Sequence, residues 1–380
     1  MHRIHSRFRR LAALVGLLAG VGAAQTTIAT GLDSPIRLTR TAAGNFFVSE
    51  AGQKPNTGHI SLVDRAGSRR VLLNGLPSAI KEGSAVGPTG TLYRDRVLYV
   101  LIGEGDVLVN GSAPGTEVSN PAGPASPIFS SLLSVTFSAD PETLTQGFTM
   151  TPGDHYKLAD GLDLTLDNGA GATATISVVA DFRDAVPDPF AIMRSSDPFG
   201  MDFDPKNPRA VYVADAAQNS LLRVDLDSGR TRTLAHFPPF PNGGTAPPVS
   251  DAVPTSVHAY GSHVLITFLS GFPFATAVGR VLDYDPATNT TAPFIYNLTT
   301  AMDIAFRDRP GLRGQFFTLE FSLNLTAAQP APGRLQRYDS PVATVVSGAL
   351  ITPTCLALDP ATGDLYVTEL ATGRILKFTN

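Results

Sequence analysis

Short runs of alternating apolar and polar residues recur along the chain, and one phrase occurs six times. In each copy, a small or turn residue is followed two positions later by an aliphatic residue and three positions after that by a second apolar residue. Alternation with a period of two indicates β-strands, and repeats of roughly 40–50 residues indicate an array of similar supersecondary units. The copies begin at Gly58, Ser130, Asn219, Gly279, Gly333 and Gly373.

Three further strand-like runs accompany the copies of this phrase. The first run starts at a proline in five units and at Ala301 in the other, and the second is aromatic and β-branched, as in Val211-Tyr212-Val213. The last unit has no fourth run before Asn380, whereas residues 27–32 resemble the fourth run at 72–76. Pairing the two ends would close the ring and remove both open sheet edges. We therefore predict an all-β, six-bladed β-propeller with four antiparallel strands per blade, whose last blade is closed by the N-terminal strand.

The second unit is longer than the others and contains two insertions. Residues 105–128 are rich in Gly, Pro, Ser and Asn and predict a long loop. Residues 138–174 combine an alternating run with the turn Asp167-Asn168-Gly169 and predict an inserted hairpin in blade two. A seventh, degenerate blade is the alternative, but this segment has no copy of the repeated phrase.

The first 24 residues have the pattern of a secretory signal peptide. Four arginines precede an apolar run at 11–21, and small residues follow it. The run is too short to span a membrane as a helix. We expect cleavage before Gln25, no membrane span after cleavage, and a secreted or periplasmic propeller domain at 25–380. A retained signal anchor is the alternative.

Charge and cysteine content narrow the classes of partner. The chain has 29 basic and 33 acidic residues, and removal of the four signal-peptide arginines leaves 25 basic against 33 acidic residues. Such a surface predicts no nucleic-acid binding. The single cysteine, Cys355, excludes an intramolecular disulfide and lies in a strand-like run, where a buried inert thiol is expected. We expect a monomer.

Strand direction predicts where the long connections lie. Connections between the second and third runs emerge on the same face as connections between blades, which groups the segments 105–127, 183–197, 237–253, 271–278 and 321–332. Loops that lengthen on one face of a rigid scaffold indicate a recognition surface. The aromatic residues expected to form a hydrophobic ligand wall there are Phe237, Phe240, Phe272 and Phe274, and the alternative is that they pack beneath their own loops.

The same face receives a carboxylate just beyond the second run in four units, at Glu50, Asp215, Glu320 and Glu369. These carboxylates could gather near the channel mouth and hold a divalent cation, Ca or Zn. The alternative is that each accepts hydrogen bonds from the backbone of its own loop. His258 and His263 flank a turn and could chelate a metal, although no third ligand is evident. The sequence has no nucleophile-elbow, zincin or phosphate-loop motif.

Seven segments carry a resemblance to a known family: 31–35, 47–52, 87–90, 197–201, 213–217, 252–257 and 269–274. Together they resemble the ScyD/ScyE family of exported propeller proteins, and the blade strands are also similar to NHL repeats. More remotely, they resemble gluconolactonase-like and strictosidine-synthase-like propellers. The gluconolactonase resemblance implies a divalent metal at the channel mouth, for which Glu50 and Asp215 are the nearest candidates.

Two functions are compatible with these observations. The expected one is a secreted binding or assembly module that recognises a small hydrophobic molecule or a protein partner on its long-loop face. The alternative is a metal-dependent lactone or ester hydrolase in which the four carboxylates hold the cation.

Overall fold

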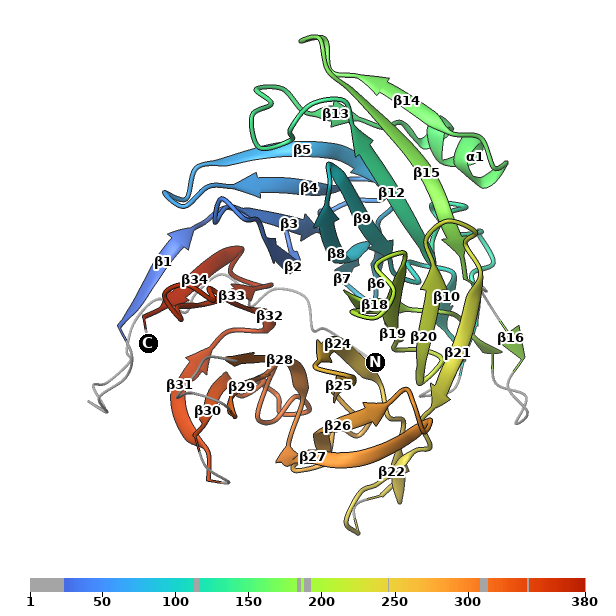
Figure 1. Ribbon diagram of the computed structural model, residues 1–380. Helices are drawn as coiled ribbons and strands as arrows, with labels where there is room; N and C mark the ends of the chain where they lie inside the picture. Colours follow the sequence, from blue (N-terminus) through green and yellow to red (C-terminus); the bar gives the residue numbers. More distant parts are fainter. Residues whose placement is uncertain are drawn as a thin grey trace.

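Six β-sheets are arranged as blades around a central axis (Figure 1). The computed structural model describes residues 24–112, 116–182, 186–187, 193–244, 246–307, 314–339 and 342–379. Residues 1–23 of the expected signal peptide lie outside the described residues. The prediction of a six-bladed propeller is confirmed.

In each of the first three blades, the strands follow one another outward from the axis in the order of the sequence. Their four principal strands are β2 (Pro35–Arg40), β3 (Phe46–Glu50), β4 (Gly58–Val63) and β5 (Arg69–Leu76) in blade one; β8 (Pro88–Arg94), β9 (Val97–Ile102), β12 (Ser131–Phe137) and β15 (Thr173–Asp181) in blade two; and β18 (Pro198–Phe203), β19 (Ala210–Asp215), β20 (Ser220–Asp225) and β21 (Thr231–His236) in blade three.

The other three blades repeat this order, and the last one closes the ring. Their strands are β24 (Pro254–Tyr260), β25 (His263–Phe268), β26 (Gly279–Asp285) and β27 (Thr290–Leu298) in blade four; β28 (Ala301–Arg307), β29 (Gln315–Glu320), β30 (Gly333–Tyr338) and β31 (Thr344–Leu350) in blade five; and β32 (Pro353–Leu358), β33 (Leu365–Glu369), β34 (Arg374–Phe378) and β1 (Gln25–Ala29) in blade six.

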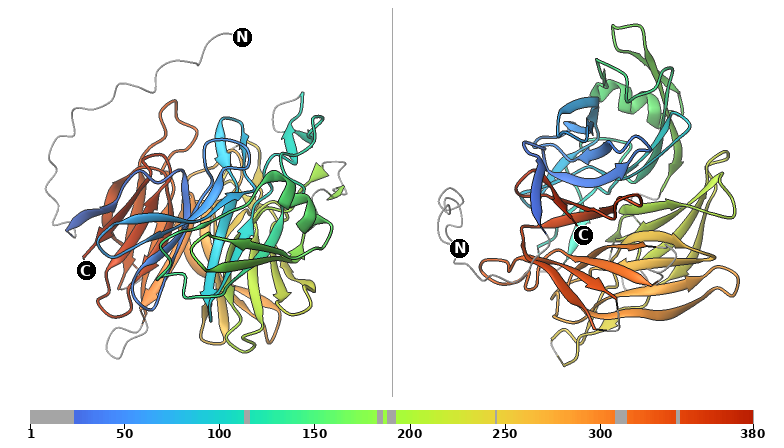
Figure 2. Two further views of the ribbon diagram at one scale, coloured as in Figure 1. Left: turned by 90° about the horizontal axis from the view of Figure 1, so that it is seen from above. Right: turned by 60° about the vertical axis from the view of Figure 1, so that its left-hand side comes forward.

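The closing strand comes from the N-terminal end of the propeller, as predicted. Strand β1 pairs antiparallel with β34, with Gln25 opposite Phe378 and Thr26 opposite Lys377. Figure 2 shows β1 beside the C-terminal strands. Because this pairing joins the first strand to the last, blade six has no open edge on β34.

Each innermost strand carries the same local irregularity. The register between first and second strands shifts immediately after the first residue of the inner strand, as between Pro35 and Arg37 and between Ala301 and Asp303. The other four blades show the same shift. A proline lacks a backbone donor and fits the first position of a strand, and a β-bulge changes the direction of the side chains that follow it. The bulges therefore decide which side chains enter the channel.

The propeller has two faces that we name by their connections. The loop face carries the connections between blades and between the second and third strands of a blade, whereas the turn face carries the short turns. Four small hairpins lie in the loop-face connections: β6 (Ala79–Lys81) with β7 (Ser84–Val86), β10 (Leu108–Asn110) with β11 (Glu117–Ser119), β16 (Val186–Pro187) with β17 (Met193–Arg194), and β22 (Phe240–Pro241) with β23 (Val249–Ser250).

Residues 138–174 lie against the outer edges of blades one and two. They contain β13 (Phe148–Thr149), helix α1 (Pro152–Ala159) and β14 (Leu164–Asp167). Strand β13 pairs parallel with β5, and β14 pairs antiparallel with β15, so each blade gains a fifth strand. The helix departs from the expectation of a hairpin alone.

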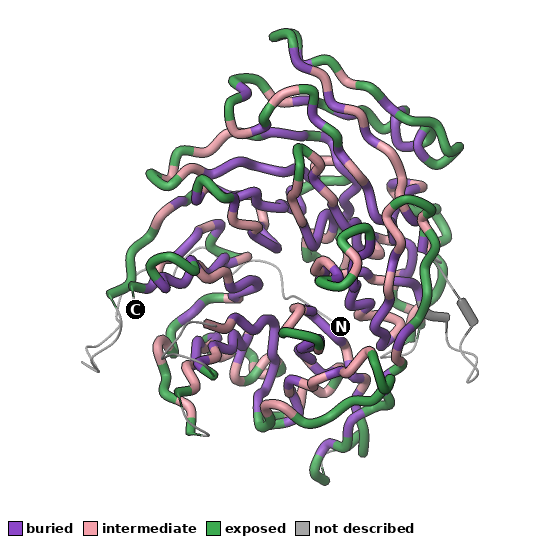
Figure 3. Tube along the Cα trace, in the orientation of Figure 1, coloured by how far each residue is buried: buried purple, intermediate pink, exposed green. Residues whose placement is uncertain are grey.

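Burial is greatest in the strands near the axis and decreases toward the outer strands (Figure 3). The apolar core lies between neighbouring blades. Its largest cluster joins blades one and two through Phe47, Phe137 and Phe148. Within the described part of the chain, no helix is both long and apolar enough to cross a membrane.

Candidate functional site

The four carboxylates expected at the loop face occupy equivalent positions. Glu50, Asp215, Glu320 and Glu369 each end the second strand of a blade and lie opposite the first residue of its inner strand. All four residues are buried. A buried carboxylate requires compensating donors, so their partners decide their role.

Blades five and six supply these donors in the same way. Glu320 accepts hydrogen bonds from the Thr299 amide (2.8 Å) and from Arg334 Nε (2.6 Å). Glu369 accepts from the Ile351 amide (2.7 Å) and from Arg374 Nε (2.5 Å). Each arginine lies directly across from its carboxylate in the sheet register. The carboxylate therefore fastens the preceding connection to its own blade.

Glu50 has a similar arrangement in blade one. Its Oε2 accepts from the Asp33 amide and from Arg69 Nη2 (2.9 Å), and it lies 3.3 Å from His59 Nε2. Burial opposes ionisation, but the hydrogen bond and charge interaction with His59 outweigh it, so the pKa of Glu50 is lowered.

Asp215 relies on neutral donors. It accepts from Ser196 Oγ (2.5 Å), the Asp197 amide (3.0 Å) and the Gln218 amide (3.0 Å). Burial raises the pKa of Asp215.

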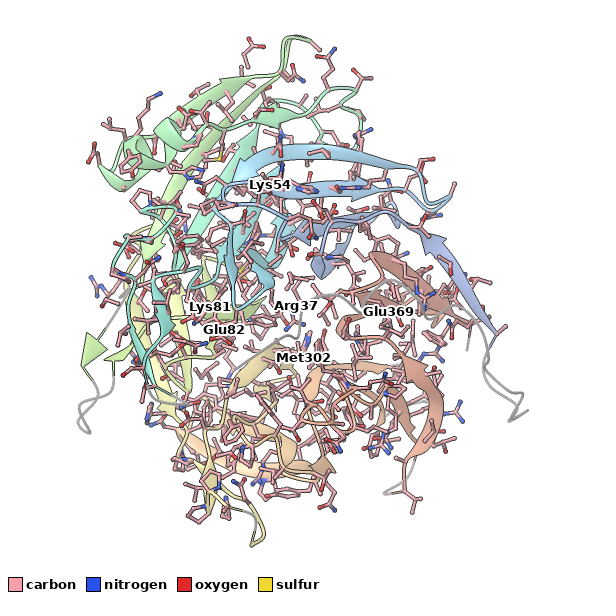
Figure 4. The ribbon with its side chains drawn as sticks, turned by 180° about the vertical axis from the view of Figure 1, so that it is seen from behind. Arg37, Lys54, Lys81, Glu82, Met302 and Glu369 are labelled. Carbon is pink, nitrogen blue, oxygen red and sulfur yellow. The ribbon has the colours of Figure 1, made fainter. Side chains whose placement is uncertain are left out.

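The four carboxylates therefore have separate partners. Each accepts a hydrogen bond from an amide of the connection that precedes its blade, and Asp215 also accepts from the Gln218 amide of its own loop. Among the residues that the structure describes, no group of three or more His, Cys, Asp or Glu side chains is arranged to hold a metal ion. In the view from behind, Arg37 lies near the axis, whereas Glu369 lies farther out (Figure 4). This donor set does not fit a shared cation site.

Blade four replaces the carboxylate with an aromatic residue. Phe268 lies opposite Pro254, and the rings of Phe237 and Phe240 pack edge-on against it with centroids 4.8 and 5.3 Å away. The Arg280 guanidinium, opposite Phe268 in register, stacks over Phe240 at 3.8 Å from the ring centroid. Phe237 and Phe240 are buried. They also line a cavity of ≈ 390 Å³ between the outer strands of blades three and four.

The other two expected aromatic residues lie on the neighbouring loop. Phe272 is 68% exposed, and its ring contacts that of Phe274 edge-on, with centroids 6.4 Å apart. Hydrogen bonds attach this loop to the preceding connection, because Ser250 Oγ donates to the Phe272 carbonyl (3.1 Å) and the Gly271 amide donates to the Asp251 carbonyl (2.8 Å). We name residues 237–244, 246–253 and 269–278 the aromatic platform.

A separate cluster of charged residues lies on the loop face near blades two and three. Lys81 pairs with Glu104 and with Glu117, and the Glu104 amide donates to Asp197 Oδ1 (3.1 Å). Burial and the neighbouring charge of Glu104 raise the pKa of Asp197 to about 7. This cluster makes Asp197 a titratable group near neutral pH.

The central channel contains a cavity of ≈ 350 Å³ lined by the inner strands of all six blades. The residue two positions after the start of each inner strand lines it, and the lining extends to Pro360, which follows β32 on the turn face. On the loop-face side, Phe199 of blade three packs against the apolar cluster of blades five and six that contains Met302. The cavity therefore opens toward the turn face.

A buried charge network lies at the inner end of this cavity. Asp303 Oδ2 accepts from Arg37 Nη1 (2.8 Å) and from the Leu356 amide (2.9 Å). Its Oδ1 accepts from His258 Nε2 (2.7 Å) and from the Ile304 amide (2.9 Å). The network joins blades one, four, five and six across the channel. We name Arg37, His258 and Asp303 the channel clasp.

The clasp changes the ionisation of its members. Burial opposes ionisation of Asp303, but Arg37 and His258 outweigh it and lower its pKa. Burial likewise opposes protonation of His258, but the Asp303 carboxylate outweighs it and raises the pKa of His258. Burial raises the pKa of the nearby Cys355 thiol to about 12, so this thiol stays protonated at neutral pH.

Sequence reasoning missed the clasp. It placed His258 beside a turn with His263, whereas the structure separates them: His258 bonds Asp303 inside the channel and His263 Nδ1 bonds Asp283 (2.8 Å). A usable signal is the position two residues after the start of the inner strand, where Arg37 and Asp303 are charged, whereas the other four blades have small or weakly polar residues there: Gly90, Gly200, Ser256 and Cys355.

No protein-family model matches the chain, and no curated protein matches its sequence. Three solved structures are similar to it in fold. A protein of unknown function from Bacteroides thetaiotaomicron has a TM-score of 0.52 at 8% identity, covering 93% of this chain and 75% of that chain. A protein named as a putative oxidoreductase (glucose dehydrogenase) from Thermus thermophilus has a TM-score of 0.50 at 14% identity, covering 94% of this chain and 99% of that chain.

The third structure is a glucose dehydrogenase, with a TM-score of 0.51 at 15% identity, covering 94% of this chain and 99% of that chain. At these identities the similarity shows a shared β-propeller fold and carries no activity to this chain.

Proposed function

We propose that this protein is a non-catalytic binding module that recognises a small hydrophobic molecule, or an apolar segment of a protein partner, on its loop face. The observation that carries the proposal is Phe272, a large aromatic side chain that is 68% exposed on a loop fastened by hydrogen bonds. An aromatic ring held in place contributes contact area without a large ordering cost.

The aromatic platform has the features of a preformed surface. Ser250 is buried and its hydroxyl is placed to bond both Asn242 Oδ1 (2.8 Å) and the Phe272 carbonyl (3.1 Å). Val249, on the same hairpin, adds a second exposed apolar side chain. Within the platform, Phe240 is buried in the core cluster and anchors the hairpin. Rigid loops with exposed apolar groups are typical of recognition surfaces.

The metal-dependent lactone or ester hydrolase remains the less supported function. It requires Glu50, Asp215, Glu320 and Glu369 to share a divalent cation such as Ca or Zn. Arg69, Arg334 and Arg374 instead neutralise three of them within their own blades. A cation would have to displace these arginines, so the contacts favour the binding function.

We propose that the protein is exported, with residues 1–24 as its signal peptide and 25–380 as one secreted or periplasmic propeller domain. We also propose that it is a monomer and a member of the ScyD/ScyE family. Closure of the sheet by β1, which begins at Gln25, is compatible with cleavage before that residue. Intact mass and size-exclusion measurements on protein isolated from expressing cells test these statements, and a retained N-terminus or a dimer would contradict them.

Nile red, a neutral hydrophobic dye, can test the binding function directly. We expect the dye to bind the full chain and Phe272→Ala to weaken its affinity by about fivefold or more, because the exposed ring is lost. Val71→Ala is the matched control, since Val71 is an exposed apolar residue on the outer strand of blade one, away from the platform. Equal dye affinity in the wild-type protein and Phe272→Ala would refute the proposal.

A further inference from the structure

The channel cavity contains charged side chains that the loop-face function does not use. We propose that it binds a small organic monoanion, a compact carboxylate with a short apolar body, whose charged group faces Arg37 and His258. The site opens on the turn face, so its ligand would be separate from anything bound by the aromatic platform.

The acceptor of the channel clasp has no capacity left for a ligand. An ionised carboxylate offers about four lone-pair positions. Asp303 uses them for Arg37 Nη1, His258 Nε2 and the amides of Ile304 and Leu356. A ligand in the cavity therefore meets a saturated carboxylate and cannot rely on it as a hydrogen-bond acceptor.

The cationic members keep unused donors. Arg37 is 6% exposed and lines the cavity; its Nη1 bonds Asp303 and its Nη2 bonds the Thr255 carbonyl, whereas its Nε is fully buried. Each terminal nitrogen of a guanidinium carries two N–H donors, so Nη1 and Nη2 each keep one. His258 engages Asp303 through Nε2, and its Nδ1 has no partner among the described contacts. When the ring is protonated, Nδ1–H is a second donor on a residue that lines the cavity.

The remaining polar groups near the clasp do not take up its spare donors. Asp202 interacts electrostatically with His258, but its oxygens accept from the amides of Phe203 and Ala259 (2.8 Å each), and burial raises its pKa. The Cys355 thiol is uncharged at neutral pH because its pKa is raised to about 12 by burial. The spare N–H groups of Arg37 and His258 therefore have no acceptor among the described contacts. A carboxylate ligand would supply one.

The size and walls of the cavity limit the rest of the ligand. A volume of ≈ 350 Å³ is near the lower end for ligand pockets and equals that of about a dozen water molecules at about 30 Å³ each. Leu38, Leu92, Met201 and Val257 contribute apolar lining. A carboxylate on a ring or a short hydrocarbon chain fits these limits.

Benzoate and benzamide form a matched pair of probes because they differ in charge but hardly in shape. We expect calorimetric titration of the full chain at pH 6 to show benzoate binding at least about tenfold more tightly than benzamide. Loss of one charge-assisted hydrogen bond changes affinity by about this factor or more. The benzoate affinity should also fall as the pH rises from 6 to 9, since His258 loses its proton, while benzamide should show no such change.

Three variants test the location. His258→Asn should weaken benzoate binding by about tenfold, and Ala357→Phe should abolish it by filling the cavity that Ala357 lines. His263→Asn is the matched control, because His263 lies outside the channel lining, and should leave binding unchanged. Phe272→Ala should also leave it unchanged, which separates this site from the loop-face function. Equal affinities for benzoate and benzamide, or benzoate binding that persists in a folded Ala357→Phe protein, would overturn the proposal.

Discussion

The channel clasp predicts a large stability loss on substitution of one buried carboxylate. Asp303→Asn removes the charge that compensates Arg37 and His258, and its amide group would face donors where an acceptor is required. Because Asp303 is 1% exposed, water cannot replace the lost interactions. Removing one partner of a buried ion pair costs about 3–5 kcal/mol. We expect Asp303→Asn to lose that much free energy of unfolding.

A second Asp–His pair in the same hairpin region provides the control. His263 Nδ1 bonds Asp283 at 2.8 Å, with side chains 40% and 23% exposed. His258 Nε2 bonds Asp303 at 2.7 Å, with side chains 31% and 1% exposed. Exposed pairs contribute about 0.2–1 kcal/mol. Urea unfolding followed by circular dichroism suits this chain because it has no Trp, and Asp283→Asn should shift the midpoint far less than Asp303→Asn.

The loss should depend on pH in a defined direction. The raised pKa of His258 contributes stability that is complete below its ordinary value of 6.5 and is lost as the pH rises through the folded-state pKa. The lowered pKa of Asp303 contributes stability that is present above pH 3.8, the ordinary pKa of an aspartate. The difference between wild type and Asp303→Asn should therefore be larger at pH 6 than at pH 9. Equal midpoints for the two Asn variants at pH 6 would refute the account of the clasp.

Three further predictions concern other parts of the propeller. His155 bonds the Gly75 carbonyl through Nε2 (2.8 Å), and burial lowers the pKa of the imidazole. The neutral ring therefore stabilises the fold, and this stability is lost as the pH falls below 6.5. His155→Gln should reduce the drop in melting temperature between pH 7 and pH 5. The pKa of Asp197 is raised to about 7, so ionisation of this carboxyl destabilises the fold. Asp197→Asn should therefore raise the urea midpoint more at pH 8 than at pH 5. Phe268→Ala should cost about 3–5 kcal/mol in urea unfolding, and Phe272→Ala less than about 0.5 kcal/mol.

The blades could be predicted because their pattern is local. Each strand shows its alternation within a few residues, and the similarity of residues 27–32 to 72–76 was sufficient to assign β1 to the open edge of blade six. Helix α1 was not predicted, because its eight residues include Pro152 and Gly153 and it is held by tertiary contacts of His155. Such a short helix has too few turns to show a clear periodicity.

The clasp could not be predicted for a different reason. Arg37 and Asp303 are separated by 266 positions in the sequence, and only the bulge at the start of each inner strand places both in the channel. The aromatic residues show a similar limit. Whether Phe240 formed a ligand wall or a core depended on Phe268, which occupies the position where four blades have a carboxylate.

That replacement in blade four also changes how the aromatic platform is held. In blades one, five and six the strand-end carboxylate binds an amide just before the inner strand and pairs with a cation. Phe268 can do neither, and other contacts hold the connection before blade four. The Val253 amide donates to Asn219 Oδ1 of blade three (2.8 Å), Ser250 Oγ and the Asp251 carbonyl bond the segment 271–272, and Arg280 stacks on Phe240. Because a loop anchored at several points can hold an exposed ring such as Phe272 in place, these contacts support the proposed binding surface.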